Sequence, residues 1–164
     1  MIKVLISLVY LSLLLVFSAS ACKKQKPPSG DHSFYCYIDG ELFVPKGDPN
    51  FTTSPYVEPL TFYVNQENFR IRAFNSKYHV MINIVNWGVG THYLSQSEDY
   101  YNHSTNHARV GVNQTWYVSK PNSGKVTFTE ASLDGNIKGT FEFTLYNEND
   151  DSDVIHVTGG HFDD

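Results

Sequence analysis

The chain has 164 residues, a formal net charge of −5 and two cysteines. An acidic chain without a basic stripe excludes nucleic acid as an expected partner. The sequence has no Gly-x-Ser-x-Gly motif, dinucleotide-binding fingerprint or phosphate loop, so it indicates no common enzyme class and no cofactor.

Residues 1–21 have the three parts of a secretory signal. Lys3 supplies the positive charge, Val4–Phe17 the apolar stretch, and Ser18–Ala21 a small-residue cleavage zone. The apolar stretch is shorter than the roughly 20 residues of a spanning helix, which disfavours a transmembrane anchor. A plain secretory signal is the closer alternative. Because Cys22 follows directly, the segment resembles the lipobox of bacterial lipoproteins, with Ala19 in place of the usual leucine. This resemblance implies a lipid on Cys22.

Residues 22–33 are expected to be a lipidated flexible tether. Pro27, Pro28 and Gly30 disfavour regular structure, and three lysines beside Cys22 can contact anionic headgroups. Surface-exported lipoproteins of the Bacteroidota often carry acidic residues after the cysteine, and these are absent here. We expect a cell-envelope lipoprotein of the outer membrane that faces the periplasm and has the membrane as its partner.

Residues 34–164 suit one β domain, since 131 residues (164 − 33) can form a single core. Asp39-Gly40 predicts a tight hairpin turn, and residues 45–59 and Ser95–Ala108 are expected to be loops. No helical period appears outside the signal, so the expected fold class is all-β: an antiparallel meander of about ten short strands forming a sandwich or barrel. The expected strands are Phe34–Ile38, Glu41–Val44, Thr61–Asn65, Phe69–Phe74, Val80–Val85, Thr91–Leu94, Arg109–Val112, Thr115–Ser119, Lys125–Leu133, Gly139–Tyr146 and Val154–Thr158.

Two strands have informative patterns. Phe141, Phe143 and Leu145 alternate with polar residues, which predicts that these three share the buried face of one strand. Val80–Val85 is apolar on nearly both faces and predicts a central strand. Cys36 alternates with apolar neighbours and is expected to be a buried small residue, not a nucleophile.

Five short motifs in a fixed order resemble a family of short Bacteroidota lipoproteins of unknown function. The resemblance spans most of the domain and implies fold and location, but no activity. The motifs are Phe34–Gly40, Gly90–Leu94, Gly124–Phe128, Gly139–Phe143 and Val157–Asp163.

The loop Ser95–Ala108 contains the candidate metal ligands. His103 and His107 lie four residues apart, with Glu98 and Asp99 nearby. These side chains could bind a transition metal, although exposed loop polarity explains them equally simply.

Aromatic residues make up 15% of the chain and offer a second kind of site. The rings of Tyr93, Tyr100, Tyr101 and Trp116 could stack on a glycan or an apolar ligand. The alternative is that a small all-β core needs their bulk.

Three functions are compatible with these features. The first is a non-catalytic tethered β domain that binds a ligand, such as a glycan, or an envelope protein. The second is a structural or assembly protein of the envelope without a small-molecule site. The third is a hydrolase, for which the sequence offers the weakest support.

Overall fold

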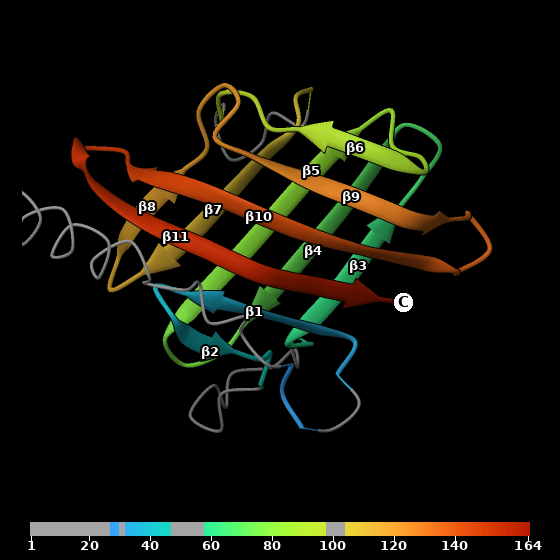
Figure 1. The fold of residues 1–164 in the computed structure, drawn as a ribbon, viewed down its shortest axis with the longest axis horizontal. Helices are drawn as coiled ribbons and strands as arrows, with labels where there is room; N and C mark the ends of the chain where they lie inside the picture. Colours follow the sequence, from blue (N-terminus) through green and yellow to red (C-terminus); the bar gives the residue numbers. More distant parts are fainter. Residues whose placement is uncertain (1–26, 30–31, 47–57, 98–103) are drawn as a thin grey trace, which may run out of the picture.

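The computed structural model describes residues 27–29, 32–46, 58–97 and 104–164. These residues form 11 strands and no helix, which confirms the all-β prediction (Figure 1). A helix long and apolar enough to cross a membrane is thus not found in these ranges. The strands are β1 (Phe34–Ile38), β2 (Glu41–Phe43), β3 (Leu60–Val64), β4 (Asn68–Phe74), β5 (Tyr78–Val85), β6 (Gly90–Tyr93), β7 (His107–Val112), β8 (Thr115–Val118), β9 (Gly124–Ala131), β10 (Ile137–Asn147) and β11 (Asp150–Asp163).

All strand pairs are antiparallel and belong to one strongly curled sheet. Its main path is β2-β1-β11-β10-β8-β7-β5-β4-β3, and β9 lies between β10 and β6. The sheet divides at β10, because residues 137–143 pair with β9 whereas Tyr146 and Asn147 pair with β8. In Figure 1, the front layer of β6, β9, β10, β11 and β1 crosses over a back layer of β8, β7, β5, β4 and β3.

The two layers enclose a core rich in phenylalanine. Phe69 of the back layer contacts Phe128 and Phe162 of the front layer, with ring centroids 4.9 Å and 5.4 Å away. Burying one such ring stabilises the fold by about 1.5–3 kcal/mol. Cys36 is fully buried beside this core, as predicted, and burial raises the pKa of its thiol. It therefore packs as a small apolar side chain and is not a reactive thiolate.

Strand β10 has the predicted alternation. Phe141, Phe143 and Leu145 are 3%, 4% and 0% exposed and face the core. Thr140 and Glu142 are exposed on the opposite side. This outward side of β10 is central to the candidate site below.

The predicted hairpins and the predicted central strand are also confirmed. Asp39 and Gly40 connect β1 to β2 with φ values of 49° and 83°, the left-handed pair of a type I′ turn. Residues 65–67 connect β3 to β4, where the Asn65 side chain accepts hydrogen bonds from the turn's backbone N–H groups. β5 pairs with β4 on one side and β7 on the other.

Two predicted boundaries are wrong. β7 begins at His107, inside the segment predicted as the loop Ser95–Ala108, because His107 and Ala108 pair with β5 and are buried. β11 extends well beyond the predicted Val154–Thr158, since Gly159 and Gly160 continue the strand instead of ending it. Of the predicted loop 45–59, residues 47–57 lie outside the described residues.

Candidate functional site

The outer face of the front layer carries two rows of polar and aromatic side chains. Each row crosses five strands, because residues opposite each other in register point to the same side of a sheet. Hydroxyl groups predominate among these side chains. The first row is Tyr93, Lys125, Glu142, Thr158 and Tyr37, and the second is Thr91, Thr127, Thr140, His161 and Tyr35.

A β-bulge interrupts the first row. Glu142 of β10 faces two residues of β11, Thr158 and Gly159, because the register shifts at this point. Gly159 has a φ of 58°, a left-handed conformation that glycine adopts without strain. Bulges often lie beside functional sites, where they redirect side chains. Because Gly159 has no side chain, the surface in front of Glu142 stays open.

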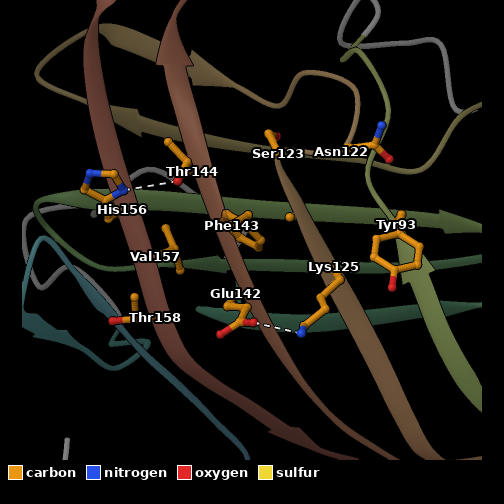
Figure 2. A pocket seen from close by; sticks show the side chains of 11 residues that line it. Tyr93, Asn122, Ser123, Lys125, Glu142, Phe143, Thr144, His156, Val157 and Thr158 are labelled. Carbon is orange, nitrogen blue, oxygen red and sulfur yellow. Dashed lines mark hydrogen bonds and ion pairs between the residues drawn. The ribbon is translucent and has the colours of Figure 1, made fainter. Parts of the chain in front are cut away.

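Two hollows lie along these rows and meet at Lys125 and Glu142. The first, of about 340 Å³, extends from Tyr93 to His156 and Thr158 (Figure 2). The second, of about 390 Å³, extends from the same Lys125 and Glu142 to Tyr35 and His161. Together they form one shallow surface from the β6 edge to β1, long enough to accept an extended ligand.

Lys125 and Glu142 form an ion pair of 3.0 Å where the hollows meet. Figure 2 shows the two side chains extending toward each other across β9 and β10. The hydrogen bond from Lys125 to Glu142 raises the pKa of the lysine. Both side chains are about half exposed, and an exposed pair of this kind contributes little to stability. The two charged groups can therefore bind ligand hydroxyls without a large loss of stability.

Aromatic rings lie at both ends of the surface. Tyr93 is 61% exposed at the β6 edge. At the β1 end, the rings of Tyr35 and His161 stack with centroids 5.3 Å apart. His156 lies beside the first hollow, where its Nδ1 and the Thr144 hydroxyl are hydrogen-bonded at 3.1 Å. Exposed rings with hydrogen-bonding groups between them can hold a polar ligand that has flat apolar faces.

The structure does not bring the predicted aromatic residues together. Tyr93 lies on the front-layer face, whereas Trp116 lies on β8 of the back layer. The Trp116 ring contacts Arg109 and His79 there. Tyr100 and Tyr101 lie outside the described residues.

Of the predicted metal ligands, Glu98, Asp99 and His103 also lie outside the described residues. His107 is 3% exposed on β7, and its Nδ1 is 3.0 Å from the Thr105 carbonyl oxygen. Within the described part of the chain, no group of three or more histidine, cysteine or acidic side chains could hold a metal ion.

Most of the front-layer residues were not singled out from the sequence. Lys125, Glu142, His156 and His161 occupy ordinary outward positions of amphipathic strands. The alternation of β10 did predict which side Glu142 would face, but the partner of each residue depends on strand register. That register is set by the bulge and by the long pairing of β10 with β11.

A protein-family model matches residues 60–164 of the chain. The chain belongs to the family described as Domain of unknown function (DUF6252). The DUF6252 match includes β6, β9, β10 and β11, and hence Tyr93, Lys125 and Glu142, whereas Tyr35 precedes it. No curated protein and no solved structure matches the chain.

Proposed function

We propose that this protein is a non-catalytic envelope lipoprotein that binds an oligosaccharide on the outer face of its front layer. The observation that carries the proposal is the continuous surface formed by the two rows and the two hollows. Tyrosine rings at its ends can stack on sugar rings, while threonine hydroxyls and the Lys125–Glu142 pair can hydrogen-bond sugar hydroxyls.

A protein partner fits this surface less well than a glycan does. Stable protein interfaces have an apolar centre surrounded by a polar rim. On this face the centre is the charged pair Lys125–Glu142, and the aromatic residues lie at the ends. The exposed Leu42, Val89 and Leu133 do not line either hollow.

Binding without hydrolysis is favoured by the acidic residues of the surface. Most glycoside hydrolases use two carboxyl groups on either side of the scissile bond, about 5–9.5 Å apart. Among the described residues that line the two hollows, Glu142 is the one carboxylate. It is also paired with Lys125, which favours the ionised form and leaves no carboxylic acid to protonate a leaving group.

The tethered location in this proposal is supported by the resemblance of residues 18–22 to a lipobox. Residues 23–33 would connect a lipid on Cys22 to β1, and 11 extended residues span at most about 36–40 Å. The domain would then reach glycans near the periplasmic face of the outer membrane. The Bacteroidota resemblance of the motifs supports the same location.

A binding screen tests the proposal. The detergent-solubilised full chain would be applied to an array of envelope oligosaccharides, including peptidoglycan fragments and lipopolysaccharide-core sugars. We expect a subset to bind and to be released intact. An array without any bound sugar would contradict the glycan proposal, and cleaved sugars would contradict the absence of catalysis.

A further inference from the structure

All three arginines of the chain lie on the outer face of the back layer. Arg70 and Arg72 alternate with core residues along β4, and Arg109 lies on β7. Met81 of β5 is opposite Arg72 on one side and opposite Arg109 on the other. The whole chain has a net charge of −5, so this face has a local charge opposite to that of the protein.

Four buried polar side-chain atoms of the described residues have no hydrogen-bond partner, and all four belong to this face. They are Nε of Arg72, Nε of Arg109, Nε2 of His79 and Oδ1 of Asn68. A guanidinium is always protonated, so each buried arginine Nε is a donor without an acceptor. Buried polar groups nearly always have a partner, and an exception needs an explanation such as a bound ion.

Trp116 borders this cluster. Its ring lies 5.0 Å from the Arg109 guanidinium carbon and 5.5 Å from the His79 ring. Gly111 provides the space, because a Cβ at this position would come within 3.0 Å of the Trp116 ring. Stacking occupies one face of the guanidinium and leaves its N–H edge free to bind an anion.

The positive charge of the cluster is only partly neutralised. Arg109 is 8% exposed, and its one carboxylate partner is Glu148, 3.4 Å away at the rim. Arg72 makes no ion pair with a described residue. Burial, followed by the charge of Arg72, lowers the pKa of His79 to about 4, so its ring is neutral at neutral pH. A partly buried guanidinium without a counter-charge is destabilising, and a bound anion would remove that cost.

We propose that Arg72, His79 and Arg109 form a binding site for a phosphate group on the outer face of the back layer. Arginine binds phosphate oxygens with paired N–H groups, and the neutral His79 ring can donate one further hydrogen bond. The site lies on the opposite layer from the glycan surface and does not depend on it. A soluble phosphate compound and a phospholipid headgroup present the same chemistry, and the experiment below distinguishes them.

Trp116 is a built-in reporter for this site. The chain has two tryptophans, so Trp87→Phe leaves Trp116 as the sole fluorophore. This full chain, in detergent, would be titrated with sodium phosphate at constant ionic strength. We expect a saturable change in Trp116 fluorescence that sodium chloride does not produce.

Three variants test the assignment. Arg72→Gln should weaken phosphate binding about tenfold or more, because it removes the charge and the paired donors. Arg72→Lys should give an intermediate loss, because it keeps the charge but not the planar fork. Lys138→Gln, which removes an exposed charge from the front layer, should change the affinity less than about twofold.

Nanodiscs identify the source of the phosphate group. A response to phosphatidylglycerol nanodiscs but not to free phosphate or phosphatidylcholine nanodiscs would assign the site to an anionic headgroup. A response to free phosphate would assign it to a soluble compound. The proposal is overturned if neither probe changes the Trp116 signal. It is also overturned if folded Arg72→Gln and Arg72→Lys chains, verified by circular dichroism, respond like the parent chain.

Discussion

Gly139 of β10 lies directly opposite Phe162 of β11, and the Phe162 ring occupies the space where a side chain at position 139 would be. The arrangement is reciprocal, because Gly160 of β11 lies opposite Phe141 of β10 and is covered by its ring. The two late sequence motifs, Gly-Thr-Phe and Gly-His-Phe, therefore pair with each other in antiparallel register. Each glycine makes room for the phenylalanine of the other strand.

Replacing either glycine should destabilise the fold. In Gly160→Ala the new Cβ would clash with the Phe141 ring, which has little room to move in a packed core. We expect a loss of about 1–3 kcal/mol in the free energy of unfolding, measured by urea denaturation. Gly88→Ala is the matched control, since a Cβ there meets no atom within 4 Å. Equal stability of the two variants would show that the glycine–phenylalanine pairing is not required.

The two sides of β10 should also differ in their response to truncation. Phe143→Ala removes a ring that is 4% exposed, and we expect it to lower the free energy of unfolding by about 3–5 kcal/mol. Thr144→Ala removes an outward hydroxyl that bonds to His156, so its loss should be under about 1.5 kcal/mol. Similar losses in a denaturant titration would contradict the assignment of faces.

Acidification should weaken the fold through His79. The pKa of this ring is lowered from 6.5 to about 4 in the folded state, mainly by burial. Between these values the unfolded chain binds a proton that the folded chain does not, so the free energy of unfolding falls as pH decreases from 6.5 toward 4. His79→Gln cannot titrate and should lose less stability over this range. Parallel urea curves for the two proteins at each pH, with the same decrease, would contradict this explanation.

The fold was largely predictable from the sequence because its strands are amphipathic. The alternation of Phe141, Phe143 and Leu145 set the buried face of β10, and Asp39-Gly40 set the first turn. The start of β7 was missed because His107 is a polar residue buried on the outer face of a strand, which hydrophobic periodicity does not detect.

The candidate site was much less predictable. Tyr93 was identified from its side-chain type, but Lys125 and Glu142 acquire their meaning from being neighbours across β9 and β10. The same is true of the arginine cluster, since Arg72 and Arg109 are adjacent only through β5. Both sites depend on strand register, which long-range pairing determines and local sequence does not.

Lipidation of Cys22 is tested by mass spectrometry of membrane-extracted protein. We expect an N-terminal Cys22 carrying acyl chains, because the small-residue cleavage zone ends directly before it. More than one chain is needed for stable anchoring, since a single acyl chain binds a membrane only marginally. Cys22→Ala should remain as the uncut precursor. An unmodified N-terminus at residue 22 would contradict the prediction.

The most direct test of the proposed glycan surface is a comparison of two exposed tyrosines. Tyr93 is 61% exposed on the front layer, and Tyr63 is 47% exposed on β3 of the back layer. Isothermal titration calorimetry with the best-bound sugar of the array would give the affinities of Tyr93→Ala and Tyr63→Ala. We predict a loss of about tenfold for Tyr93→Ala, corresponding to about 1.4 kcal/mol, and no measurable loss for Tyr63→Ala, with unchanged melting temperatures. Equal affinities of the two variants, or a loss confined to Tyr63→Ala, would contradict the front-layer site.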